Sequence, residues 1–213
     1  AWTADNKGFY YGRFDEPKGK EFESVNYFQK LYYHRLGTPQ SQDRLIHESK
    51  EHKDWQFSPT VTDDGKYLII TVAKGTDDKY RILYQDLTKP GSKLVELIDN
   101  FDAEYTFLDN DGPVFWFKSD LNAPRGKVIA IDTRKPQPKD WKELIPQSAD
   151  NLAGVSVLNN LFVARYLKDA YAQVKVFDLS GKLVRDLPLP GIGSVGGFGG
   201  KRSDKETFYA YTS

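Results

Sequence analysis

The histidines are the side chains of this sequence best suited to acid–base or metal chemistry, and two of them lie close together. His47 and His52 flank a short charged run, residues 48–51. A zinc-protease helix needs two histidines four residues apart, so that both imidazole rings share one helical face. Here the second histidine comes one residue too late, and its surroundings favour strand and loop. The pattern indicates a solvated loop, and we expect no metal site.

A glycine-rich segment, residues 191–200, contains the spacing G-x-G-x-x-G at Gly191, Gly193 and Gly196. A dinucleotide site needs this pattern between a strand and a helix, so that the helix N-terminus meets the pyrophosphate. So many glycines will not open a helix. The segment also lacks the G-x-S-x-G nucleophile elbow, because Ile192 occupies the first glycine position. The glycines therefore indicate close approach of neighbouring backbone, and no cofactor is expected.

Carboxylates are frequent, but they gather where the chain turns. Asp63, Asp64, Asp109 and Asp111 all lie within three residues before a glycine, and turn chemistry explains them. The sequence has no cysteine, no histidine in a supported motif and no serine at an elbow. A nucleophilic triad is therefore not visible, and we assign no catalytic residue.

Composition excludes several classes of function. The 213 residues carry 30 basic and 30 acidic side chains, so the chain lacks the basic excess typical of nucleic-acid or anionic-membrane binders. No apolar run approaches the roughly 18 residues that span a bilayer. Without cysteine the chain forms no disulfide, which leaves its compartment open, cytoplasmic or periplasmic. The chain starts at Ala1 and contains no methionine, so we expect it to be part of a longer protein.

Short aromatic and β-branched runs separated by turn dipeptides predict a nearly all-β protein. Typical runs are residues 66–72, 114–117 and 173–177, and typical turns are Asp-Asp-Gly at 63–65 and Ser-Gly at 180–181. Asp or Asn before Gly supplies the positive φ that tight hairpins require. The best helical candidate, residues 25–36, alternates like a strand in its second half.

The strands recur in units of about 50 residues. The residues that open a strand after a hairpin turn are Phe9, Tyr67, Val114, Phe162 and Phe208. In the first four units a third strand follows at residues 30–37, 81–88, 127–133 and 173–181, and a fourth at 44–47, 94–98, 141–145 and 183–187. Three of the third strands end on an aspartate that can accept turn hydrogen bonds: Asp86, Asp132 and Asp178.

This repeat favours a β-propeller built of four-stranded antiparallel blades over an antiparallel sandwich, which also has short strands and regular turns. The predicted blades cover residues 1–50, 51–100, 101–148 and 149–190, with a half-blade at 191–213. Four and a half blades would leave a free edge and uncovered faces, which invite aggregation. We therefore expect a part of a larger ring, and an isolated fragment that self-associates.

Several strings in this sequence closely resemble the prolyl oligopeptidase family of serine peptidases, also called prolyl endopeptidases. They are AWTADNKGFYY at 1–11, QKLYYHRLGT at 29–38, QSQD at 40–43, LIDNF at 97–101 and FYAYTS at 208–213. The similarity runs along the whole chain in one order, and the QKLYYHxLGT run is quite specific. The chain looks like the later blades of that family's seven-bladed propeller.

The resemblance implies a two-domain peptidase that cleaves short peptides after proline. Its partners would be short proline-containing peptides and the catalytic α/β-hydrolase domain of the same parent chain. The propeller caps the active site and excludes folded proteins by size, while the Ser/Asp/His triad belongs to the hydrolase domain. The rival hypothesis is a stand-alone propeller that serves as an interaction or ligand-binding module, since fold alone does not separate the two.

The resemblance also places an outer substrate subsite. The family uses the residue after the tryptophan of a W-x7-D-D-G segment and a residue in the turn two strands later, which here are Gln56 and Thr76. Trp55, the tryptophan itself, lies in a polar loop and is the third candidate. Mammalian relatives have sulfur-containing side chains at the first two positions. Gln56 and Thr76 are polar, so we expect a weaker preference for apolar substrate residues.

Overall fold

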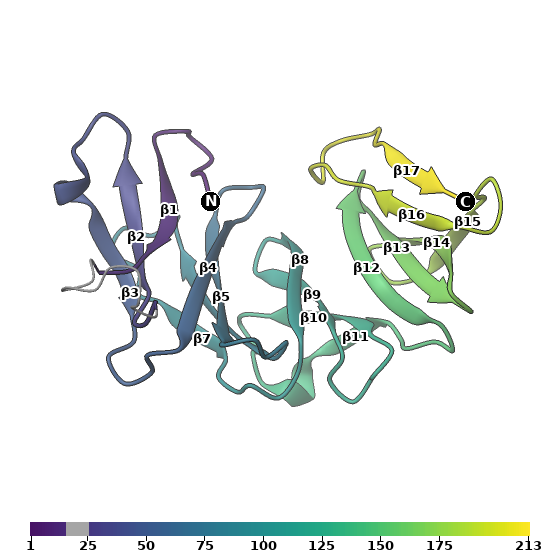
Figure 1. Cartoon of the computed structure of the whole chain (residues 1–213), viewed down its shortest axis with the longest axis horizontal. Coiled ribbons are helices and arrows are strands. Elements are labelled where there is room, and N and C mark those ends of the chain that lie inside the picture. Colours follow the sequence, from purple (N-terminus) through teal and green to yellow (C-terminus); the bar gives the residue numbers. More distant parts are fainter. Residues whose placement is uncertain (16–25) are drawn as a thin grey trace. The chain divides into compact units, whose positions relative to one another are not determined.

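The computed structural model describes residues 1–15 and 26–213, and strands dominate it (Figure 1). Two short 3-10 turns, η1 (Gln40–Gln42) and η2 (Pro138–Asp140), accompany them. Over the described ranges, no helix is long and apolar enough to cross a membrane. The chain divides into two compact units, Ala1–Asp102 and Ala103–Ser213.

The first unit contains two antiparallel sheets whose strands pair in the order in which they occur in the sequence. The three-stranded sheet has the order β1-β2-β3, and the four-stranded sheet has the order β4-β5-β6-β7. Their bounds are β1 (Gly8–Arg13), β2 (Lys30–Arg35), β3 (Arg44–Glu48), β4 (Trp55–Val61), β5 (Tyr67–Lys74), β6 (Tyr80–Asp86) and β7 (Val95–Ile98).

The tight turn between β4 and β5 shows how the predicted turn dipeptides work. Gly65 has a φ of +69°, a conformation that side chains with a Cβ rarely adopt. The Asp64 carboxylate accepts hydrogen bonds from the Thr62 hydroxyl at 2.7 Å and the Lys66 amide at 3.0 Å. This turn sets the register in which Val61 pairs with Leu68.

The core of the first unit lies between its two sheets. Its fully buried members include Leu31 from β2 and Leu68, Ile70 and Val72 from β5. The alternate residues of β5 point to the other face of the sheet, where Ile69 is also buried. A strand buried on both faces explains why residues 67–72 are a nearly continuous apolar run.

The second unit contains two four-stranded sheets and a two-stranded hairpin. The sheets have the orders β8-β9-β10-β11 and β12-β13-β14-β15, and the hairpin pairs β16 with β17. Their bounds are β8 (Tyr105–Asp111), β9 (Val114–Ser119), β10 (Lys127–Asp132), β11 (Lys142–Ile145), β12 (Asn151–Leu158), β13 (Leu161–Lys168), β14 (Tyr171–Asp178), β15 (Leu183–Leu187), β16 (Ser194–Gly197) and β17 (Tyr209–Thr212).

Two apolar layers hold the second unit together, one on each face of β13. Phe162 and Ala164 pack toward β8–β11, where the edge of Phe162 meets Trp116 with ring centres 5.2 Å apart. Val163, on the other face, packs with Val174 and with Phe198, which directly follows β16. Each sheet of this unit is therefore covered by the next along the chain, as in stacked blades.

The strand predictions agree closely with the structure. The third and fourth strands expected in each of four units are present, and β2 occupies the second half of residues 25–36, whose first residue lies outside the described ranges. The first predicted blade, residues 1–50, differs: only a single bridge, Trp2 to Phe9, is present where its first strand was expected. Residues 4–7 turn the chain directly into β1.

Candidate substrate-contacting site

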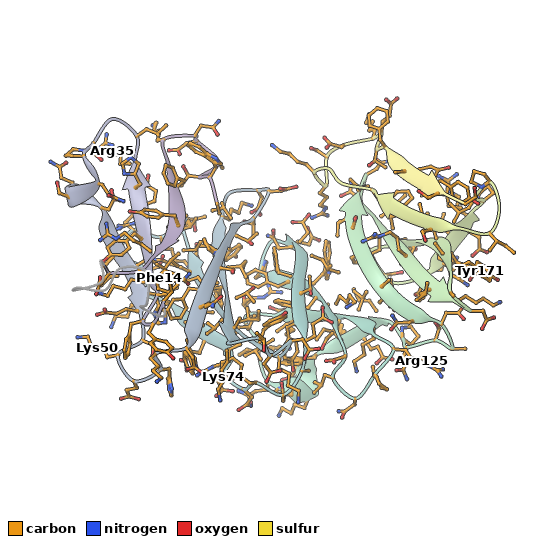
Figure 2. All side chains as sticks on the ribbon, in the orientation of Figure 1. Phe14, Arg35, Lys50, Lys74, Arg125 and Tyr171 are labelled. Atoms are coloured by element: carbon orange, nitrogen blue, oxygen red, sulfur yellow. The ribbon has the colours of Figure 1, made fainter. Side chains whose placement is uncertain are left out.

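The three predicted site residues, Trp55, Gln56 and Thr76, lie at one end of the four-stranded sheet of the first unit. Trp55 and Gln56 begin β4, and Thr76 lies in the connection from β5 to β6. The cross-strand partner of Trp55 is Lys74, which Figure 2 labels at the end of β5. The Gly75 amide donates to the Asp54 carbonyl at 3.2 Å, which ties the two segments together.

Strand alternation places Trp55 and Gln56 on opposite faces of the sheet. Trp55 and Phe57 point to the face that packs on the core, and both belong to the buried layer or its margin. Gln56 points to the opposite face and is exposed, as is Thr76. The exposed polar pair is therefore accessible to a ligand, while Trp55 supports the strand end from behind.

Trp55 is enclosed by aromatic and cationic neighbours. The His52 ring stacks on it with ring centres 4.0 Å apart and an interplanar angle of 13°. Phe101 meets it edge-on at 5.4 Å, and Cζ of Arg81 lies 4.9 Å from the Trp55 ring centre. These contacts fix the rotamer of Trp55 and the start of β4.

Arg81 is a neighbour of this site that the sequence analysis missed. It is an inward-pointing charge on β6, and Nη2 of its side chain lies 3.2 Å from Oε1 of Glu96 on β7. Its guanidinium therefore serves both as an ion-pair partner and as a cation over an aromatic ring. In the sequence, only its position directly before the apolar pair Ile82-Leu83 of this strand could have drawn attention to it.

A cavity of about 240 Å³ adjoins Trp55 on the same face. His47 lines it, and burial lowers the pKa of the His47 imidazole, which favours the neutral ring. Among the described residues, no group of three or more His, Cys, Asp or Glu side chains could hold a metal ion. The full lining is His47, Glu48, Ser49, Glu51, His52, Trp55, Arg81, Leu83 and Glu96.

The third histidine, His34, belongs to a polar cluster in the first sheet. Nδ1 of His34 lies 2.7 Å from Oδ1 of Asp43, and the Tyr11 hydroxyl donates to Oδ2 at 2.5 Å. The Asp43 side chain is only 1% exposed, and these hydrogen bonds compensate its burial. Within residues 1–15 and 26–213, no serine or threonine hydroxyl forms a hydrogen bond with the His34 ring, as a catalytic serine would. Asp43, the last residue of the QSQD run at 40–43, therefore links its loop to Tyr11 on β1 and to His34 on β2.

The glycine-rich segment also has a structural explanation. Ser194 to Gly197 form β16, and a Cβ on Gly193 would collide with the Thr212 carbonyl. The segment thus permits close approach of β16 and β17, as its composition indicated. The segment contains a strand and does not open a helix, so it lacks the strand-to-helix turn that holds the pyrophosphate in a dinucleotide fold.

Comparison with known proteins yields consistent matches along the whole chain. Residues 1–213 match the family model described as the prolyl oligopeptidase N-terminal beta-propeller domain. A prolyl endopeptidase from Elizabethkingia miricola is 35% identical over 214 residues, which cover 100% of this chain and 30% of that protein. Prolyl oligopeptidase A from Galerina marginata is 32% identical over 206 residues, 91% of this chain and 28% of that protein.

Solved structures give the same result. A structure from a study of two prolyl endopeptidases and their inter-domain dynamics superposes with a TM-score of 0.88 at 33% identity, covering 98% of this chain and 30% of that one. Prolyl oligopeptidase B from Galerina marginata, bound to a 25mer macrocyclization substrate, gives 0.87 at 28% identity, covering 95% and 29%. The chain therefore spans less than a third of the length of these relatives.

Proposed function

This chain belongs to the family of prolyl oligopeptidase N-terminal β-propeller domains, and we propose that it is the substrate-gating part of a serine peptidase that cleaves short peptides after proline. The match over residues 1–213 is the observation that carries this proposal. The propeller itself is non-catalytic. The catalytic Ser/Asp/His would come from an α/β-hydrolase domain of the same parent chain, as the resemblance of the sequence implies.

The proposed role in substrate contact belongs to Gln56 and Thr76. Both are exposed, and both lie at the end of the sheet that begins with β4. An amide and a hydroxyl can each donate and accept hydrogen bonds, which suits peptide backbone or polar substrate side chains. Trp55 contributes indirectly, because its contacts with His52 and Arg81 hold the neighbouring residue in place.

We further propose that the five sheets are successive blades of a seven-bladed ring, with boundaries near residues 50, 100, 148 and 190. The sequence order of strands within each sheet supports this arrangement, because each sheet is an up-and-down meander. A ring of that size needs blades beyond these 213 residues. The same incompleteness supports the proposal that the fragment self-associates.

The parent reading frame provides the first test. Its continuation past Ser213 into a segment that contains G-x-S-x-G would support a peptidase. A frame without such a segment would reject that proposal and leave the stand-alone interaction module. In a second assay, the pure 213-residue chain is expected not to hydrolyse a Gly-Pro-type chromogenic peptide. Hydrolysis sensitive to serine reagents would contradict the assignment of catalysis to another domain.

The subsite has its own test, which rests on substitution of one exposed side chain. Gln56→Met should raise the affinity of the chain for peptides with an apolar residue, relative to polar ones, by about tenfold, as one apolar pocket contact does. Ser58→Met is the matched control, since Ser58 is exposed on the same face of β4 but further from the sheet end. Isothermal titration that shows equal shifts for both variants would remove Gln56 from the subsite.

A further inference from the structure

Arg165 carries a positive charge that nothing in the described structure neutralises. It lies on β13, an interior strand of the four-stranded sheet β12–β15, and it is half-buried. Its Nε atom is buried and has no hydrogen-bond partner. Throughout residues 1–15 and 26–213 no carboxylate pairs with its guanidinium. A buried donor without a partner is unfavourable, and the charge of this guanidinium has no counter-ion among the described residues.

Arg81 provides a comparison, because it is a second arginine with a buried Nε but its charge has partners. Arg81 also has a buried Nε without a partner, but its Nη2 pairs with Glu96 and its guanidinium lies over Trp55. Within the described ranges Arg165 has neither compensation. The two arginines therefore differ in the one respect that matters for binding: of the pair, Arg165 keeps its charge available.

The local backbone is shaped to accommodate this guanidinium. Arg165 pairs in register with Gly154 of β12, next to a bulge between Leu152 and Gly154. A Cβ on Gly154 would collide with Nη2 of Arg165 and would lie 3.2 Å from its Cζ. Glycine thus lets the side chain lie flat across the first strand of its sheet. A bulge beside a functional group commonly redirects a side chain in this way.

Several apolar side chains lie on the same face as Arg165. Val163, two residues earlier, packs with Val174 and with Phe198, next to β16. Val174 is also the cross-strand partner of Arg165 on β14. The β14 side of this face is already covered by the β16–β17 hairpin, so a ligand has to approach from the open side, past β12.

The β12 side of the sheet is where successive sheets converge. β12 contacts β8, the first strand of the preceding sheet, and β1 contacts β4 in the same manner in the first unit. In a propeller the sheets are arranged around a central channel, and the converging edges face it. In the proposed ring β12 would face this channel, and the Arg165 guanidinium lies across Gly154 of that strand.

We infer that Arg165 binds a carboxylate group of a peptide ligand, either an acidic side chain or a free C-terminus. The inference rests on the proposed function, which supplies peptides as ligands. A carboxylate matches the planar fork of a guanidinium, and its negative charge would neutralise that of Arg165. The site would favour acidic peptides over neutral ones of the same shape.

Two blocked peptides that differ in one charge test this site. Ac-Gly-Pro-Glu-NH2 and Ac-Gly-Pro-Gln-NH2 are titrated into the 213-residue chain, with the arginine Nε–Hε resonances followed by NMR. The glutamate peptide should bind about tenfold more tightly and shift the Arg165 resonance, because a hydrogen bond to a charged group is worth about that factor. Arg165→Gln should abolish the preference. Arg185→Gln, at an exposed arginine on β15 of the same sheet, should keep it.

A third peptide, Ac-Gly-Pro with a free C-terminal carboxylate, distinguishes the two sources of the charge. Tighter binding of this peptide than of the glutamate peptide assigns the site to a C-terminus, and the reverse order assigns it to an acidic side chain. Either order supports the inference, provided that Arg165→Gln removes the difference from the neutral peptide.

The outcomes separate this inference from the proposed function. Affinity that does not depend on the charge of the peptide, or an unmoved Arg165 resonance, overturns the carboxylate site but leaves peptide binding intact. If none of the peptides binds the unmodified chain, both the carboxylate site and the proposed role in substrate contact are rejected. If Arg165→Gln does not fold, Arg165→Lys takes its place: it keeps the charge without the planar fork and should reduce the preference for the glutamate peptide. A lysine variant with the full preference overturns the inference.

Discussion

At the scale of single residues, aspartates stabilise the ends of the third strands. Asp86, Asp132 and Asp178 each accept a hydrogen bond from the amide two residues later, at 3.0, 3.0 and 2.9 Å. These bonds hold the turn that leads to the fourth strand. The sequence analysis predicted turn hydrogen bonding for these residues, and the structure confirms it.

Asp132 offers a pH test of this role. Hydrogen bonds from Arg134 lower the pKa of the Asp132 carboxyl from 3.8 to about 2. Its stabilising contribution is therefore fully present above pH 3.8 and disappears as the pH falls through about 2. Asp132→Asn should reduce the free energy of unfolding at neutral pH by less than about 1 kcal/mol. In urea unfolding, the difference in free energy of unfolding between Asp132→Asn and the unsubstituted chain should vanish near pH 2.

The partner residue supplies the control for that experiment. In Arg134→Gln the carboxyl of Asp132 loses the bonds from Nε and Nη2, which are 2.8 and 2.7 Å long. Its pKa should rise toward the ordinary value of 3.8. An Asp132 carboxyl whose NMR titration is identical with and without Arg134 would contradict the assigned cause.

At the scale of elements, the β16–β17 connection is secured by one arginine. Nε of Arg202 donates to Oδ1 of Asn160 and Nη1 donates to the Asn110 carbonyl, both at 2.7 Å. Its Cζ lies 5.1 Å from the ring centre of Trp116. Arg202 thereby joins the connection to the hairpins β8–β9 and β12–β13. The sequence pattern predicted these hairpins, but it did not indicate that the β16–β17 connection would pack against them.

Arg202→Gln should loosen this connection. Loss of charged hydrogen bonds and of the ring contact should destabilise the second unit by about 1–3 kcal/mol. The Phe198 amide, which donates to the Phe208 carbonyl at 2.9 Å, should then exchange with deuterium faster. Arg202→Lys keeps the charge but not the fork, and should give an intermediate rate. Unchanged exchange in the glutamine variant would show that the loop holds without Arg202.

At the scale of the whole molecule, the last hairpin governs the proposed association. The β16–β17 sheet has only two strands, and the side chain of Phe208 is 91% exposed beside β17. A short uncovered strand with an exposed aromatic neighbour is a ready template for pairing. Such an edge is expected if further blades complete the proposed ring.

Self-association should therefore depend on concentration and on this edge. Sedimentation velocity should show a mass that increases with protein concentration. Phe208→Lys should weaken the association by about tenfold, because a charge at the edge opposes strand pairing. Val184→Lys, at an exposed apolar position on β15, is the matched control and should change the mass little. A strictly monomeric chain at all concentrations would argue against an uncovered edge.

The sequence by itself determined the strands, their turns and the family. These depend on local chemistry: Asp-Gly turns, period-two alternation and motif strings all lie within a few residues of one another. The placement of Gln56 and Thr76 in one subsite rests on resemblance alone and stays a prediction.

Only the tertiary structure decided which face each candidate occupies and which charges have partners. It showed that Trp55 turns its ring inward, that Arg81 packs over that ring, and that Arg165 lies across Gly154 without an ion-pair partner among the described residues. These facts depend on residues far apart in the sequence, whose contacts arise when strands pair and one sheet packs on the next. The periodicity of a single strand therefore does not predict these contacts.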